Sequence, residues 1–141
     1  MKLHQLSVFC ENKPGQMIAP FRLLAREGVN IRALSLADTQ RFGIMRMIVS
    51  DWQRAKALLE EAGSVVKITE VVAVEVPDRP GGLAEVVEAF QGTTINIEYM
   101  YAFPFVHGEK AVLIFRFDQP DAAIARLGEK GINILDSGSI D

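Results

Sequence analysis

A short segment near the start of the chain has the residue types of a small-molecule binding loop. Asn12-Lys13-Pro14-Gly15 follows a stretch of alternating apolar residues and precedes an amphipathic one. The glycine permits close backbone approach, and the N–H groups at the start of a helix carry a partial positive charge that suits a carboxylate. The Asn12 amide can accept a hydrogen bond from an ammonium group and donate one to a carboxylate. These properties favour the segment as a ligand site.

Each nearby polar residue also has an ordinary structural interpretation. Asn12 can close an Asx-turn or cap the following helix, and Asn30 can serve a turn. Cys10 is most simply a small buried hydrophobe rather than a reactive thiol. His4 and His107 have no partnered nucleophile in a recognisable pattern, so the sequence assigns no catalytic residue.

The chain contains an internal repeat. Asn12-Lys13-Pro14-Gly15 recurs 66 residues later as Asp78-Arg79-Pro80-Gly81, and Val29-Asn30-Ile31 recurs as Ile95-Asn96-Ile97. Further on the spacing is 68, because Met45, Met47 and Val49 match Leu113, Phe115 and Phe117. Two extra residues are therefore expected around 103–108, and an insertion of two leaves the same strand faces buried. A repeat of this length predicts a duplicated small domain.

Composition excludes several classes of protein. The 141 residues carry a formal net charge of −3 and no basic stripe, which argues against a nucleic-acid partner. No apolar stretch approaches the roughly 18 residues that span a bilayer, and the first residues do not form a signal peptide. The single cysteine suits a reducing cytoplasm, and with only two histidines there is no metal-ligand cluster. We therefore expect a cytoplasmic protein with no membrane, metal or cofactor site.

Hydrophobic periodicity predicts the elements of the first repeat. A strand that buries Leu6, Val8 and Cys10 on one face is followed by a helix with an apolar stripe at Met17, Phe21, Leu24 and Ala25. Strands are expected over 29–37 and 44–49. A second helix over 52–62, capped by Ser50 or Asp51, precedes a fourth strand from Val65. Gly28 and Gly63 follow the helices at positions typical of helix ends.

The second repeat shows the same order. A strand over 71–76 precedes a helix with a stripe at Leu83, Val86, Val87 and Phe90, a hairpin over 95–103 and 111–117, and a helix capped by Asp118 with Pro120 in its first turn. This β-α-β-β-α-β order predicts an α+β protein of two ferredoxin-like repeats, 1–69 and 70–141. No Gly- or Pro-rich linker separates them, so we expect them to pack together as one rigid body.

These motifs resemble those of the ACT domain, a small-molecule-sensing module of amino-acid metabolism. The likeness lies in a strand, an Asn-x-Pro-Gly segment, a helix and a Gly-Val-Asn-Ile segment, here residues 12–15 and 28–31. It covers essentially the whole chain as two ACT repeats, and it is similar to the serine-binding regulatory domain of phosphoglycerate dehydrogenase. Where the serine-binding relatives have a histidine two residues before the loop asparagine, this chain has Cys10. That difference argues against serine as the ligand.

The resemblance implies which residues contact a ligand. In that family the effector lies at an interface between two ACT domains, held by the loop and by the asparagine before the second strand. In the second repeat Asp78 replaces the loop asparagine. Its carboxylate would repel a ligand carboxylate, although it could pair with an ammonium, so a helix cap is the preferred interpretation. The expected ligand-binding residues are Asn12, Lys13, Pro14, Gly15, Gln16, Met17, Asn30, Ile31 and Asn96.

The resemblance further implies a non-catalytic sensor that binds a free amino acid and forms a homodimer. A second hypothesis is a regulatory subunit that docks on an amino-acid biosynthetic enzyme without obligatory ligand, and a third is a small enzyme on the same scaffold. The absence of a Ser-His-Asp pattern or a phosphate loop disfavours the enzyme. The aromatic group Tyr99, Tyr101, Phe103, Phe105 and His107 either forms a packed interface or lines a pocket for a large side chain.

Overall fold

A computed structural model describes residues 1–39 and 41–140 of the chain, with the side chains of all of these except residues 39 and 105–107. The chain forms two compact units: the first unit is His4–Thr69, and the second unit is Met1–Leu3 together with Glu70–Asp141. Lys2 explains why the first three residues, which the repeat assigns to 1–69, group with the second unit. Its ammonium lies 3.0 Å from the Asp121 carboxylate and 3.1 Å from that of Glu70.

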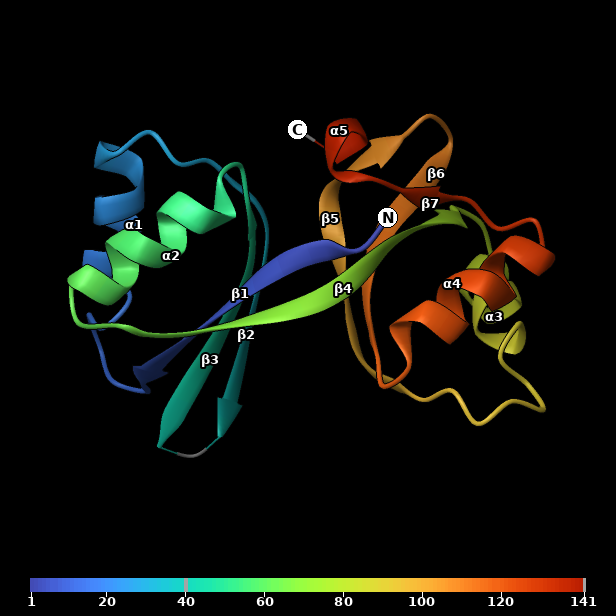
Figure 1. Ribbon diagram of the computed structural model, residues 1–141, viewed down its shortest axis with the longest axis horizontal. Coiled ribbons are helices and arrows are strands. Elements are labelled where there is room, and N and C mark those ends of the chain that lie inside the picture. Colours follow the sequence, from blue (N-terminus) through green and yellow to red (C-terminus); the bar gives the residue numbers. More distant parts are fainter. Residues whose placement is uncertain (40, 141) are drawn as a thin grey trace. The chain divides into compact units, whose positions relative to one another are not determined.

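The first unit has the predicted β-α-β-β-α-β order (Figure 1, blue to green). Its sheet has the strand order β2-β3-β1-β4, and β3 runs antiparallel to both β1 and β2. The two helices cover one face of this sheet. The elements are β1 Leu3–Glu11, α1 Ile18–Arg26, β2 Ile31–Thr39, β3 Phe42–Val49, α2 Trp52–Glu61 and β4 Val65–Pro77, whose later residues belong to the second unit.

The core of the first unit follows from the predicted periodicities. Leu24 of α1 and Leu59 of α2 are buried among strand residues that include Met45, Met47 and Val49. The stripe expected on α1 is correct for Leu24, whereas Ala25 is exposed. Because the helix begins only at Ile18, Pro20 lies in its first turn, where a missing N–H costs little.

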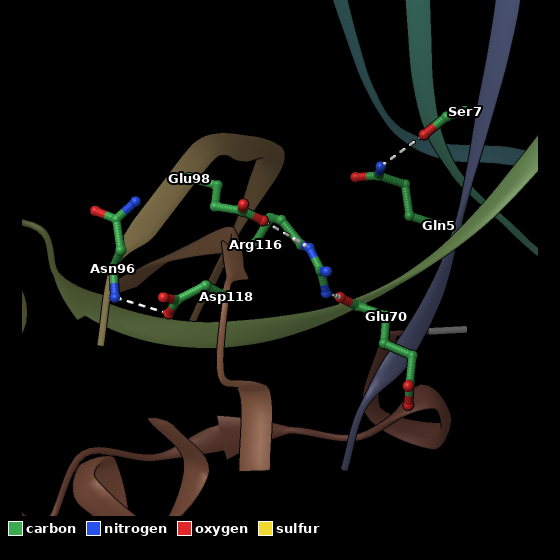
Figure 2. A network of polar contacts seen from close by, with 7 residues as sticks. All are labelled: Gln5, Ser7, Glu70, Asn96, Glu98, Arg116 and Asp118. Carbon is green, nitrogen blue, oxygen red and sulfur yellow. Dashed lines mark hydrogen bonds and ion pairs between the residues drawn. The ribbon is translucent and has the colours of Figure 1, made fainter. Parts of the chain in front are cut away.

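Strand β1 differs from its expected one-sided burial. Gln5 and Ser7, which alternate with Leu6 and Val8, are also buried, with 0% and 6% of their surface exposed. The Gln5 amide donates a hydrogen bond of 3.1 Å to the Ser7 hydroxyl (Figure 2). Polar side chains can be buried when they have hydrogen-bond partners of this kind. An alternating polar pattern therefore does not by itself mark a solvent-exposed face.

The second unit repeats the architecture (Figure 1, olive to red). Within this unit the strand order is β4-β6-β5, and a short strand, β7, pairs with β4 on the side away from β6. Each described pairing of these strands is antiparallel. The elements after β4 are α3 Gly82–Glu88, β5 Ile97–His107, β6 Lys110–Phe117, α4 Pro120–Glu129, β7 Ile134–Leu135 and a terminal turn of helix, α5 Ser137–Ile140.

Helix α3 buries only half of its predicted stripe. Val86 and Phe90 belong to the core with Phe115 and Phe117, whereas Leu83 and Val87 are 37% and 39% exposed. The helix ends at Glu88, so Phe90 lies beyond it, and Val86 is the one stripe residue that is buried within the seven helical residues. Its stripe is therefore partly wrong as a list of core residues.

The two extra residues of the second repeat form a bulge in β5. Ala102 pairs with Leu113 and Val106 with Ala111, so β5 uses four residues where β6 uses two. Another irregularity, between Ile97 and Tyr99, matches the one between Ile31 and Ala33 in the first repeat. The predicted insertion is confirmed, and it leaves Phe115 and Phe117 on the buried face.

The helix ends confirm some predicted caps and contradict others. The Asp51 carboxylate accepts a hydrogen bond from the Arg54 N–H at the start of α2, as expected. The N-cap of α4 is Gln119 and that of α3 is Gly81, both without a side-chain cap bond. Asp118 and Asp78 are therefore not caps. Asp118 is instead engaged by a backbone N–H of another segment.

Candidate functional site

The segment between β1 and α1, residues 12–17 (the Asn12–Met17 loop), is an exposed turn with unused hydrogen-bond donors. The N–H of Asn12 donates to the Arg41 carbonyl at 3.0 Å, which fixes the end of β1. Gly15 has φ +82°, a left-handed conformation that a side chain would strain. Within the described part of the chain, the Asn12 amide and the N–H groups of Gly15 and Met17 have no hydrogen-bond partner. They can bind an anionic group.

The other side chains of this loop have different surroundings. The Lys13 ammonium lies 2.7 Å from the Glu11 carboxylate, and this hydrogen bond raises the pKa of the lysine. Pro14 and Gln16 are exposed, whereas Met17 is half-buried and packs against the core of the first unit. Met17 therefore offers a ligand its backbone N–H rather than its side chain.

Asn30 is held by its backbone and leaves its side chain exposed. Its N–H donates to the Ser50 hydroxyl at 3.0 Å, and its carbonyl accepts from the Ser50 N–H, also at 3.0 Å. The Asn30 amide makes no hydrogen bond with any residue that the structure describes. Ile31 beside it packs against the core, so of this pair Asn30 alone presents a polar group to solvent.

Asn12 and Asn30 lie at opposite ends of the first unit's sheet. The loop end of β1 pairs with Phe42 at the start of β3, whereas Ile31 pairs with Val49 at its other end. Seven steps along a strand at ~3.3 Å each place the two asparagines roughly 20 Å apart. A single copy of the first unit therefore does not bring both side chains to one amino acid.

Asn96 reproduces the geometry of Asn30 in the second unit. Its N–H donates to the Asp118 carboxylate at 2.8 Å, and its carbonyl accepts from the Asp118 N–H at 3.1 Å. Figure 2 shows its side-chain amide directed away from Asp118. Asn96 lines a shallow hollow that also includes Val87 and Gln91.

The loop of the second repeat makes two contacts that the loop of the first repeat lacks. A Cβ added to Gly82 would lie 1.9 Å from the Pro77 carbonyl oxygen, so helix α3 starts directly against the end of β4. The Arg79 guanidinium contacts both carboxylate oxygens of Glu85, at 2.8 and 3.0 Å. The corresponding positions of the first repeat are Gln16, Lys13 and Ala19, which make neither contact.

Cys10 and the aromatic residues have packing positions. The Cys10 thiol lies 3.7 Å from the Gly43 carbonyl, and a Cβ on Gly43 would meet both Leu36 and this sulfur. Phe103 is buried, and Tyr99 and Tyr101 are half-buried. The side chains of Phe105 and His107 lie outside those described.

Sequence analysis missed a hollow between α1 and α2 in the first unit. It is lined by Gly15, Ile18, Leu23 and Leu59, with Arg22 and Arg26 also in the lining. The signal was available: two arginines four residues apart lie on the same face of a helix.

The described residues contain no candidate metal site and no candidate membrane-spanning helix. No group of three His, Cys, Asp or Glu side chains there could hold a metal ion. In the same part of the chain, the helices are too short or too polar to cross a bilayer.

Solved structures show what the chain is similar to. The protein BT0572 from Bacteroides thetaiotaomicron is 36% identical, with a TM-score of 0.92 over 99% of this chain and 96% of that one. The ligand-free regulatory subunit of aspartate kinase from Thermus thermophilus has a TM-score of 0.61 at 18% identity, over 89% of this chain and 90% of that one. Its counterpart from Thermus flavus has a TM-score of 0.60 at 19% identity, with the same coverage of both chains.

At 18% and 19% identity, these two kinase subunits share the fold alone. None of the curated proteins matches the chain. The likeness to phosphoglycerate dehydrogenase stays a prediction. The family model for an ACT domain pair matches residues 1–138, nearly the whole chain. Together with the two β-α-β-β-α-β repeats, this match shows that the chain belongs to the ACT domain family, as a pair of ACT domains.

Proposed function

We propose that this ACT domain pair is a non-catalytic sensor that binds a free amino acid at the Asn12–Met17 loop. ACT domains are regulatory, amino-acid-binding modules. The observation that carries the proposal is the group of unused donors on this loop: the Asn12 amide and the N–H groups of Gly15 and Met17. Donors of this kind at the start of a helix suit the ligand's carboxylate, and the Asn12 carbonyl oxygen suits its ammonium.

The position of Asn30 indicates how the site is completed. Because Asn12 and Asn30 lie at opposite ends of one sheet, a ligand that contacts both must lie between two domains. We infer a homodimer in which the loop of one copy meets the Asn30 of the other. Such an isologous arrangement gives two identical sites.

The second repeat is the weaker candidate for ligand binding. Its loop carries the Arg79–Glu85 ion pair, and Gly82 lies tightly against Pro77. The Asp78 carboxylate at the position of Asn12 would also repel a ligand carboxylate. Asn96 remains exposed, but the loop of its own repeat has no amide side chain at the position of Asn12.

A thermal-shift screen of the twenty amino acids at millimolar concentration tests the proposal. A ligand at one hundred times its Kd adds about 2.7 kcal/mol to the free energy of unfolding, which raises the Tm by several degrees. Asn12→Ala and Asn30→Ala should each abolish the shift and leave the unliganded stability within about 1 kcal/mol of wild type. Gln53→Ala, an exposed change on α2, is the matched control and should leave the shift intact.

The result that would overturn the sensor is a melting curve that no amino acid moves. We expect serine not to be the preferred ligand, because Cys10 occupies the position of the histidine in the serine-binding relatives. A serine shift larger than that of every other amino acid would contradict this part of the proposal.

One observation favours the alternative, a subunit that docks on an amino-acid biosynthetic enzyme without obligatory ligand. Phe9 and Phe42 extend from neighbouring strands on the same sheet face and are 40% and 54% exposed. Exposed aromatic side chains that lie close together are typical of protein contact surfaces. If no amino acid binds, loss of enzyme association in Phe42→Ser would support this alternative.

A further inference from the structure

The α1–α2 hollow of the first unit is large enough to hold a small molecule. Its volume is about 560 Å³, within the roughly 300–1,000 Å³ of ordinary ligand pockets. It shares only Gly15 with the Asn12–Met17 loop, and its other lining residues belong to α1, to α2 or to the residues just after α2. The hollow therefore borders the proposed amino-acid site at Gly15, and the rest of its lining is separate from that site.

The floor of the hollow is apolar. Leu59 of α2 is buried, Leu23 of α1 is half-buried, and Ile18 at the start of α1 is 50% exposed. Ala19 and Ala62 complete this surface with small side chains. Covering these groups would remove apolar area from water, which favours binding of a molecule with an aliphatic body.

The charged groups of the lining are two arginines, and no acidic residue contributes to it. Arg22 and Arg26 are four residues apart on α1 and both are exposed. Neither guanidinium makes an ion pair or a hydrogen bond with the residues described by the structure. Among nearby acidic residues, Glu27 is paired with Arg54 and Glu60 with Lys56. The hollow thus combines an apolar floor with two cations that are available to an anion.

The second repeat provides an internal comparison. The positions of Arg22 and Arg26 are Glu88 and Gly92 there, so the cationic pair is absent. Arg126, which replaces Leu58, crosses between the helices, and its Nε donates to the Ala89 carbonyl at 2.6 Å. The basic, open hollow is therefore a property of the first repeat and does not follow from the shared fold.

We propose that the α1–α2 hollow binds an apolar monocarboxylate, with its carboxylate on Arg22 and Arg26 and its aliphatic body on Ile18, Leu23 and Leu59. Guanidinium groups bind carboxylates through charge-assisted hydrogen bonds, and both arginines can reach one anion from a single helix face. This goes beyond amino-acid sensing at the loop. It gives the protein a second input, a free acid with an aliphatic chain.

Titration of the full-length protein with octanoate, followed by amide NMR shifts, tests the proposal. We expect the shifts to concentrate on α1 and the end of α2. The cationic isostere octylammonium should not bind, and neutral 1-octanol should bind at least tenfold more weakly than octanoate. The double variant Arg22→Ala/Arg26→Ala should weaken octanoate binding by about tenfold or more, because both charge-assisted contacts are lost.

Matched variants separate charge from shape. Arg22→Lys/Arg26→Lys keeps both charges and should retain most of the affinity, whereas Ala19→Trp should fill the hollow and abolish binding. Ala19 is exposed, so the variant should fold, and an unchanged Tm without ligand checks this. Asn30→Ala should leave octanoate binding unaltered while it removes any amino-acid shift, which separates the two sites.

Three results would overturn the proposal. The first is absence of octanoate binding at millimolar concentration. The second is equal affinity for octanoate and 1-octanol, which would show that the arginines do not favour a carboxylate over a neutral hydroxyl group. The third is full octanoate affinity in Ala19→Trp, or its loss in Asn30→Ala, because either would place the acid outside the hollow.

Discussion

Asn96 and Asp118 are joined by two hydrogen bonds at the point where β5 begins and β6 ends. The Asn96 N–H donates to the Asp118 carboxylate at 2.8 Å, and the Asp118 N–H donates to the Asn96 carbonyl at 3.1 Å. Asn30 and Ser50 repeat this arrangement in the first unit, with a hydroxyl in place of the carboxylate. Each asparagine is therefore fixed through its main chain, and its amide is left for another partner.

This relationship predicts a difference between two equivalent variants. Asp118→Ala should lower the free energy of unfolding by about 1 kcal/mol or somewhat more, since a hydrogen bond to a charged acceptor is lost. Ser50→Ala removes a neutral acceptor and should cost about 0.5 kcal/mol. Urea denaturation at constant m-value measures both. A larger loss of unfolding free energy in Ser50→Ala than in Asp118→Ala would show that the carboxylate does not strengthen this pair of hydrogen bonds.

Mixing two inactive variants tests the shared site. If each site takes Asn12 from one copy and Asn30 from the other, a hybrid dimer of Asn12→Ala and Asn30→Ala chains has one intact site and one doubly damaged site. Random exchange makes about half of the dimers hybrid, so calorimetric titration should recover about a quarter of the wild-type sites. Light scattering that shows a monomer, or a mixture without recovered binding, would contradict the arrangement.

Equivalent positions in the two loops should respond differently. Arg79→Met removes an exposed ion pair with Glu85 and should cost at most about 1 kcal/mol of stability, with no effect on the amino-acid thermal shift. Lys13→Met, the matched change in the first repeat, should weaken the shift because it removes a positive charge from the loop proposed to bind the ligand's carboxylate. Loss of the shift in Arg79→Met alone would instead assign the ligand to the second repeat.

Asp136 predicts a pH dependence at the C-terminal end. The Ser139 N–H donates to its carboxylate at 3.0 Å and the Ser139 hydroxyl at 3.1 Å, and these bonds lower the pKa of Asp136 below its ordinary value. A carboxyl group with a lowered folded-state pKa stabilises the fold above its ordinary pKa, and this contribution is lost as the pH falls through the folded value.

Asp136→Asn should accordingly lower the Tm at neutral pH. The difference in Tm between Asp136→Asn and wild type should disappear at pH values below the ordinary carboxyl range, where both proteins carry a neutral group at this position. Melting curves across that range measure it, with the exposed change Glu61→Gln as control. A gap that stays constant with pH would mean that the effect of Asp136 is not electrostatic.

Local patterns in the sequence are sufficient to predict the order of strands and helices and the duplication. The 66- and 68-residue spacings predicted the duplication, and hydrophobic periodicity predicted the order of elements, because both depend on local geometry that repeats along the chain. The change of spacing from 66 to 68 also predicted two extra residues around 103–108, where the structure has the bulge between Ala102 and Val106, and an even insertion keeps Phe115 and Phe117 buried. The ACT resemblance followed from these features.

The partners of each polar side chain depend on the tertiary structure and are not predicted by local sequence patterns. Asp118 is a residue type that is common at helix N-caps, yet its carboxylate accepts a hydrogen bond from the Asn96 N–H. The hairpin of β5 and β6 brings these two residues together, although they are 22 positions apart in the sequence. Asn12 and Asn30 share a motif, but strand direction places them at opposite ends of β3. The spacing of Arg22 and Arg26 does not identify a site, because the hollow that they line forms only where α1 and α2 pack together. Contacts between distant segments depend on how elements pack, which a local pattern does not encode.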